Sequence, residues 1–190
     1  MVLTIAQDPA ADELLTRDPL ALLIGMVLDQ QFPMERAFGS PYLLATRLGV
    51  DRLDARDLSE MNPDELARVF TGPPALHRFP GSMAARVQAV CRLLVADYGG
   101  DAAALWTGVD SGTELLRRLE ALPGFGKQKA RIFLALLGKQ LDIRPDGWQE
   151  AAGPYGEAGS YRSVADVTGP ESLATVREFK RAAKAAAKSG

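Results

Sequence analysis

The sequence has almost none of the residues from which metal centres and disulfides are built. It holds one cysteine, Cys91, and one histidine, His77, among 190 residues. A single cysteine excludes an intramolecular disulfide and a four-thiolate iron–sulfur cluster. A single histidine argues against a zinc site and against a histidine-based catalytic triad. Any chemistry must therefore come from carboxylates, amides, lysines or the backbone.

Long apolar runs are missing too. None reaches the roughly 18 residues that a membrane span needs, and the first residues lack the basic region of a signal peptide. We therefore expect no membrane partner and a cytoplasmic location. Hydrophobic residues make up 47% and charged residues 24% of the chain, which is the composition of a globular protein with a buried core.

Excess positive charge is also absent, since the net charge is −2, but the charge is polarised along the chain. Residues 1–70 carry 6 Arg against 12 Asp and Glu, whereas residues 115–145 carry 7 Lys and Arg against Glu120 and Asp142. A local basic face matters more for phosphate contact than the total charge does.

Strand-like alternation is not found, so we predict an all-α fold. Helix caps and apolar spacing predict helices over residues 19–28, 41–48, 63–70, 83–98, 113–121, 127–137 and from 170 onward. Asp18, Asn62 and Ser82 are the expected N-caps of three of them. Residues 147–160 have no clear assignment.

The most informative segment joins two of these helices through Pro123-Gly-Phe-Gly126. Gly124 and Gly126 permit positive φ and remove the β-carbons that would block a close approach. The N-terminus of the following helix then offers N–H groups and a favourable dipole to an anion, and Lys127 and Lys129 add charge. Phe125 is expected to plug the turn onto the core. The alternative is a plain helical hairpin whose glycines serve only tight packing.

The run Leu122-Pro-Gly-Phe-Gly-Lys-Gln-Lys-Ala130 resembles the hairpin of the helix-hairpin-helix (HhH-GPD) DNA glycosylases, the superfamily of endonuclease III and the adenine glycosylases. Upstream, Leu22-Leu-Ile-Gly-Met-Val-Leu-Asp-Gln30-Gln31 resembles the family's helix that ends in a Gln pair. Downstream, residues 136–147 resemble the segment that leads to its catalytic aspartate. The resemblance covers residues 15–148, with the hairpin at 115–137, and leaves 149–190 as a divergent C-terminal helical region.

This resemblance implies a two-lobed helical DNA glycosylase fold, with residues 1–190 as one unit. It implies a monomer that binds double-stranded DNA through Gly124, Phe125, Gly126, Lys127, Lys129 and Gln31. No iron–sulfur cluster is expected, because the cluster-binding cysteines of the endonuclease III branch are missing, and the resemblance allows at most a monovalent cation at the hairpin in the DNA complex.

Asp146 is the catalytic residue that the resemblance implies. A carboxylate below the sugar can stabilise an oxocarbenium-like charge and orient or deprotonate a water, as in glycoside hydrolysis. For this, Asp146 must line a cleft that faces the N–H groups of the hairpin and must not project freely into solvent. Its side chain is also expected to cap the next helix. The alternative is that Pro145-Asp146-Gly147 is only a turn, because these are preferred turn residues.

Glutamines and one tryptophan complete the expected site. The resemblance assigns Gln31 to the space left by an extruded base, and Gln30, Gln128 and Trp148 to the base pocket. Gln128 stands where bifunctional members carry the lysine that forms a Schiff base, so strand cleavage is not expected. The alternative is that Gln30 and Gln31 are two solvated residues at a helix end. Loop 71–82, with Leu76 or His77, is the candidate for a second wedge.

Three functions remain open on the sequence. The first is monofunctional base-excision DNA glycosylase activity in DNA repair, which is hydrolysis of the N-glycosidic bond of a flipped, damaged or mispaired base. The second is a catalytically inactive helix-hairpin-helix DNA-binding module, and the third is a helical interaction protein without a DNA function. The position of Asp146 relative to the hairpin is the feature that separates the first two.

Overall fold

The computed structural model describes residues 2–188, and every regular element in that range is a helix, which confirms the predicted all-α class. The elements are α1 (Pro9–Arg17), α2 (Pro19–Leu28), α3 (Met34–Leu48), α4 (Ala55–Glu60), α5 (Pro63–Thr71), α6 (Pro80–Tyr98), η1 (Ala102–Leu105), α7 (Gly112–Glu120), α8 (Lys127–Gln140), α9 (Trp148–Ala152), η2 (Gly153–Tyr155), η3 (Val164–Asp166) and α10 (Pro170–Lys188).

Helix α2 is the central element, because every residue from Leu20 to Leu28 is buried. It packs against α1, α3, α6 and η1. Asp18 caps it as expected, with its Oδ1 accepting hydrogen bonds from the N–H groups of Leu20 and Ala21, and its Oδ2 accepting one from Leu53. A helix buried on all sides is held rigidly, so its C-terminal residues are well placed to carry a site.

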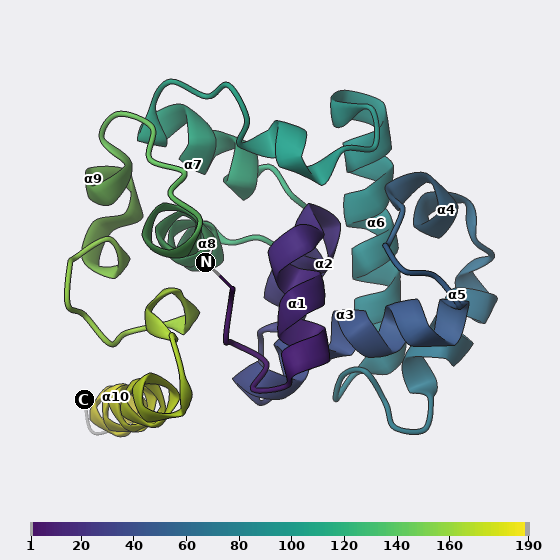
Figure 1. Cartoon of the computed structure of the whole chain (residues 1–190), viewed down its shortest axis with the longest axis horizontal. Coiled ribbons are helices and arrows are strands. Elements are labelled where there is room, and N and C mark those ends of the chain that lie inside the picture. The colour runs from purple at the N-terminus through teal and green to yellow at the C-terminus, as the bar shows by residue number, and fades with distance from the viewer. Residues whose placement is uncertain (1, 189–190) are drawn as a thin grey trace.

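The remaining helices lie on two sides of this centre (Figure 1). Helices α4 and α5 pack on α6, while α7, α9 and η3 pack on α8. Helix α10 contacts η3 and lies at the edge of the α8 side. None of the helices within residues 2–188 is long and apolar enough to cross a bilayer.

Two predicted helix starts are wrong. Helix α3 begins at Met34 and runs through Pro41, which lies inside the helix and is buried. The loss of one N–H there is tolerated because burial of the flanking residues outweighs the local cost of the proline. Helix α6 begins at Pro80, so Ser82 is an interior residue and not the cap. Asn62 does cap α5, as predicted.

The region without a sequence assignment wraps around α8. Lys139 Nζ donates to Asp166 Oδ1 at 2.6 Å, and the same carboxylate accepts hydrogen bonds from Ser160 Oγ and from the N–H of Arg162. Gln140 Nε2 donates to the carbonyl of Ala165 at 2.9 Å. These bonds fix residues 160–166 against the last turn of α8, so the chain that follows forms one wall of the cavity described below.

Candidate functional site

The turn between α7 and α8 has the geometry that its two glycines predict. Gly124 adopts φ +79°, in the left-handed region, and the Phe125 N–H donates to the carbonyl of Leu122 at 3.0 Å. Phe125 is buried and packs edge-on against Phe133, with ring centroids 6.2 Å apart. The prediction that Phe125 plugs the turn onto the core is confirmed.

The two glycines have different surroundings. A β-carbon on Gly124 would lie 2.3 Å from Cδ of Arg86, so this glycine lets a side chain of α6 pass beside the turn. A β-carbon on Gly126 would have no atom of the described chain within 4 Å. Gly124 therefore allows a close contact with the Arg86 side chain, whereas no side chain packs on Gly126.

The N-terminus of α8 is an anion-binding arrangement. Gly126 is its N-cap, and no side chain accepts a hydrogen bond from the first N–H groups of the helix. Those groups have no partner within the helix, and the helix dipole adds to their positive potential. Gly126 and Lys127 are both exposed beside them. The outer side of this turn can therefore accept a phosphate group.

Lys129 does not belong to that outer side. Its Nζ donates to the carbonyl of Val27 at 2.9 Å and to Oε1 of Gln30 at 3.2 Å. Burial lowers the pKa of Lys129 to about 8, although the charge of Asp29 opposes the shift. Two residues along a helix turn the side chain by about 200°, so Lys129 and Lys127 point to opposite sides. The expected contact of Lys129 with phosphate is replaced by a tie between α8 and α2.

Gln30 is held at the point where α2 ends. Its Oε1 also accepts from Arg86 Nη1 at 3.4 Å, and its backbone carbonyl lies 2.9 Å from Nε2 of His77. The Phe79 N–H donates to Nδ1 of His77 at 3.0 Å, so Nε2 carries the proton and donates to Gln30. His77 and Leu76 are both buried, so neither is the exposed wedge that loop 71–82 was expected to supply.

Gln31 lies beyond this anchored residue. It is exposed and adopts φ +50°, an uncommon conformation for a residue with a β-carbon. The turn therefore presents the Gln31 side chain to solvent while Gln30 remains tied to the protein. Gln30 is therefore hydrogen-bonded within the protein, whereas Gln31 projects into solvent. The pair does not consist of two freely solvated glutamines.

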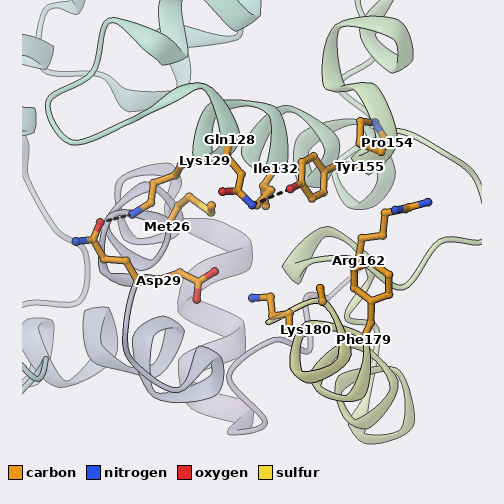
Figure 2. Close-up of a pocket in the computed structure, with 12 residues that line it drawn as sticks. Met26, Asp29, Gln128, Lys129, Ile132, Pro154, Tyr155, Arg162, Phe179 and Lys180 are labelled. Carbon is orange, nitrogen blue, oxygen red and sulfur yellow. Dashed lines mark hydrogen bonds between the residues drawn. The ribbon is translucent and has the colours of Figure 1, made fainter. Parts of the chain in front are cut away.

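A cavity of about 580 Å³ opens between the end of α2, the first turns of α8 and the C-terminal region. Figure 2 shows its lining. Its volume lies within the range typical of small-molecule sites. The central elements contribute Met26, Asp29, Gln30, Gln128, Lys129 and Ile132. Gln30 and Gln128, both predicted pocket residues, thus meet in one cavity.

The opposite wall comes from the C-terminal region, in which the sequence predicted only the helix from residue 170 onward. Tyr155, in η2, accepts a hydrogen bond from Gln128 Nε2 at 2.8 Å through its hydroxyl oxygen. Arg162 and Lys180 also line the cavity, and Lys180 extends from α10 towards Asp29 (Figure 2). Sequence reasoning missed all three residues because no local motif marks them. Asp29 directly precedes the Gln pair, and this adjacency could have drawn attention to it.

Trp148, predicted for the base pocket, does not line this cavity. Its ring packs on Gly138, where a β-carbon would lie 2.4 Å from the ring, and its backbone packs on Gly112. Gly138 lies in the last turns of α8, whereas the cavity borders the first turns. Trp148 is therefore a packing residue that fastens α9 to α7 and α8.

Asp146 does not line this cavity, whereas its predicted role requires a position in a cleft that faces the hairpin. Its N–H donates to the carbonyl of Asp110 at 2.9 Å and its carbonyl accepts from Gly112 at 2.7 Å, so its backbone forms an isolated bridge to the chain before α7. The side chain is exposed. Gly147 is the N-cap of α9, with no side-chain cap, so Asp146 does not cap that helix.

Within the part of the chain that the structure describes, no group of three or more His, Cys, Asp or Glu side chains is placed to hold a metal ion. The candidate site therefore consists of the open N-terminus of α8 on the outside and the amide-, amine- and carboxylate-lined cavity on the inside.

Comparison with protein-family models, with curated proteins and with solved structures finds no match to this chain.

Proposed function

We propose that this chain binds duplex DNA through the α7–α8 turn and hydrolyses the N-glycosidic bond of a base turned out into the cavity beneath it. The observation that carries the proposal is that the anion-binding N-terminus and the cavity share the first turn of α8. Gly126 and Lys127 lie outside, and Gln128 and Lys129 line the cavity. A backbone phosphate held at the N-terminus would keep its own sugar close to the cavity mouth.

The outer surface supplies binding that does not depend on base sequence. Backbone N–H groups and a lysine position the phosphates, and the exposed Gln31 can offer both a donor and an acceptor to the base left unpaired. Extrusion of a damaged or mispaired base costs less than extrusion of a well-paired one. The lining amides and the Tyr155 hydroxyl provide hydrogen-bonding groups for the edge of that base.

We propose hydrolysis without strand cleavage. The Gln128 amide cannot form an imine with the sugar, and the Lys129 amine is held by two oxygens at the end of α2. Borohydride added during the reaction with an abasic-site duplex should therefore trap no covalent complex. A trapped complex that disappears in Lys129→Met would instead establish lyase chemistry.

The test of the function is a panel of duplexes that each carry one modified or mispaired base. Alkali treatment after incubation reveals abasic sites as broken strands. We expect product on at least one duplex, and reduced product with Lys127→Glu, which reverses charge at the outer surface. Lys188→Glu, at the far end of α10, makes the same charge change outside the site and serves as the control.

A second function is favoured by one observation, which is the exposure of Asp146. A catalytically inactive DNA-binding module would need the hairpin but no carboxylate in a cavity. It predicts duplex binding that Lys127→Glu weakens, with no abasic product on any duplex of the panel. The two functions therefore differ in product formation and agree in binding.

A further inference from the structure

Asp29 is the carboxylate that the cavity contains. Two aspartates are candidates for the carboxylate that the proposed hydrolysis needs, and the structure separates them: Asp146 is exposed on a bridge to the chain before α7, whereas Asp29 lines the cavity together with Gln30 and Gln128. Glycosidic hydrolysis needs a carboxylate within reach of the sugar and of a water molecule. Only the second position offers an enclosed space for both.

Asp29 is also held in a fixed position. It is the C-cap of α2, a helix buried from Leu20 to Leu28. Its N–H donates to the carbonyl of Met26 at 3.3 Å, and the next N–H, of Gln30, donates to the carbonyl of Leu28 at 2.8 Å. The tie from Lys129 to Val27 joins this end of α2 to α8. The backbone of Asp29 is thus anchored from both helices.

The side chain, by contrast, is available. Within residues 2–188 the Asp29 carboxylate takes part in no hydrogen bond and in no ion pair within 4 Å. It is half-buried and extends into the cavity, facing the Lys180 side chain (Figure 2). A structural aspartate at a helix end normally bonds to backbone or to a cation. A fixed carboxylate without such a partner has its oxygens free for a substrate and a water.

The charges around Asp29 suit this task. Burial raises the pKa of its carboxyl group, and the nearby charges of Lys180 and Lys129 oppose that rise, while Glu35 adds to it. The two lysines come from α10 and α8, on two different walls. They favour the ionised form of Asp29 without occupying its oxygens, which leaves the carboxylate able to accept a proton.

Resting on the proposed function, we propose that Asp29 is the catalytic carboxylate of the glycosidic hydrolysis. One oxygen faces C1′ of the extruded nucleoside and stabilises its developing positive charge. The bond from C1′ to the base nitrogen breaks, and its electron pair leaves with the base. Water forms the new bond to C1′ and gives a proton to Asp29, which then passes it through solvent to the departed base. The products are a free base and an abasic sugar.

The experiment compares Asp29→Asn, which keeps the shape but cannot ionise, with Asp146→Asn on the same duplex under single-turnover conditions. Asp97→Asn, an exposed residue near the end of α6, is the control for loss of one charge. We expect Asp29→Asn to slow base release at least about 100-fold, the lower end of the effect of a positioned acid–base group. Duplex affinity should stay within about 2-fold, because binding belongs to the outer surface.

Each outcome is decisive. Loss of activity in Asp146→Asn with retention in Asp29→Asn overturns the assignment while the proposed function stands. Absence of product from the unmodified protein on every duplex overturns both. Circular dichroism and thermal unfolding check that Asp29→Asn is folded. Asp29→Glu keeps the charge but displaces it by one methylene, so it should be slowed less than Asp29→Asn. If both variants lose activity equally and both have lost their folded structure, Asp29 is needed for folding and not for catalysis.

Discussion

The outer and inner sides of the first turn of α8 look alike in sequence and differ in role. On the outer side, Gly126 has no atom within reach of an added β-carbon, and Lys127 is exposed. On the inner side, Gly124 accommodates Arg86 and Lys129 is tied to the end of α2. The glycine and the lysine of the outer side are thus placed for contact with a partner. The glycine and the lysine of the inner side contact other parts of the protein.

The difference follows from the geometry of the helix. Residues two apart on a helix point in nearly opposite directions, so a Lys-Gln-Lys run at its start cannot present both lysines to one surface. The inner lysine instead joins the hairpin to the Gln30 turn. The divided turn links the surface that would grip a phosphate to the cavity that would hold a base.

Substitution of the two glycines tests this comparison through the free energy of unfolding, and its expected effect is the largest. Gly124→Ala should lower the free energy of unfolding by about 1–2 kcal/mol, because alanine is strained at positive φ, and displacement of Arg86 adds to the loss. Gly126→Ala should change it by less than about 0.5 kcal/mol, as expected of an open surface position. Urea denaturation measures both. Equal effects from the two variants would contradict the division into sides.

The Gly126→Ala variant sharpens the same comparison through binding. Its added methyl group lies where a phosphate would approach the first N–H groups of α8, so duplex affinity should fall although stability is retained. Fluorescence anisotropy with a labelled duplex measures the affinity. Unchanged affinity would remove Gly126 from the proposed DNA-binding surface.

Acidification tests His77, whose ring is hydrogen-bonded to the Gln30 carbonyl on the inner side. Burial lowers the pKa of His77 below the usual 6.5. The folded protein therefore keeps His77 neutral where the unfolded chain already binds a proton, so stability falls as pH drops below about 6.5, by at most about 1.4 kcal/mol per pH unit. The difference in unfolding free energy between the unmodified protein and His77→Gln should shrink from pH 7 to pH 5. A constant difference would show that His77 does not titrate in this range.

Acidification is expected to lower the stability of the protein through His77. Replacement of the Asp29 carboxylate by an amide is expected to raise it. Because burial raises the pKa of Asp29 above its unfolded value, ionisation of this carboxyl group costs more free energy in the folded protein than in the unfolded chain, and the full cost is present at pH values above the folded pKa. Asp29→Asn should therefore increase the free energy of unfolding at pH 7, by on the order of 1 kcal/mol. Thermal unfolding at pH 7 measures it. A less stable variant would indicate that Asp29 holds a structural contact.

The smallest effect concerns Lys127 alone. Lys127→Ala should leave stability unchanged within about 0.5 kcal/mol and weaken duplex binding for all sequences alike. The slope of log affinity against log salt should become shallower by about 1, as expected for the loss of one phosphate contact. Lys188→Ala changes the net charge equally and should leave the slope unchanged. A slope that Lys127→Ala does not alter would place the phosphate contact elsewhere.

The features that the sequence predicts correctly are local. The Asp18 and Asn62 caps, the turn at Gly124 and the burial of Phe125 each depend on a few adjacent residues and on the backbone conformations they allow. One local prediction is wrong, because Ser82 lies inside α6 and is not its cap. The other wrong predictions concern longer distances. Pro41 was expected to start a helix, but packing of α3 keeps it in the interior.

The cavity could be anticipated only in part. Gln30 and Gln128 were expected there, and the structure brings them together across 98 residues of chain. Tyr155 and Arg162 lie in segments without a predicted element, and Lys180 lies in a predicted helix whose position was not predicted. They reach the cavity because the Lys139–Asp166 pair fastens residues 160–166 to α8. Trp148 and Asp146 were placed by their distance from the hairpin in sequence, which does not determine the direction of a side chain.

The sequence by itself determined the all-α class, most of the helices and the two-glycine turn, because these depend on residue type and near neighbours. Only the tertiary structure decided which glycine packs and which is open, which lysine faces outward, and that Asp29 lines the cavity while Asp146 is exposed. Those facts depend on which helices meet, and burial of α2 between its neighbours places its last residues beside the first turn of α8.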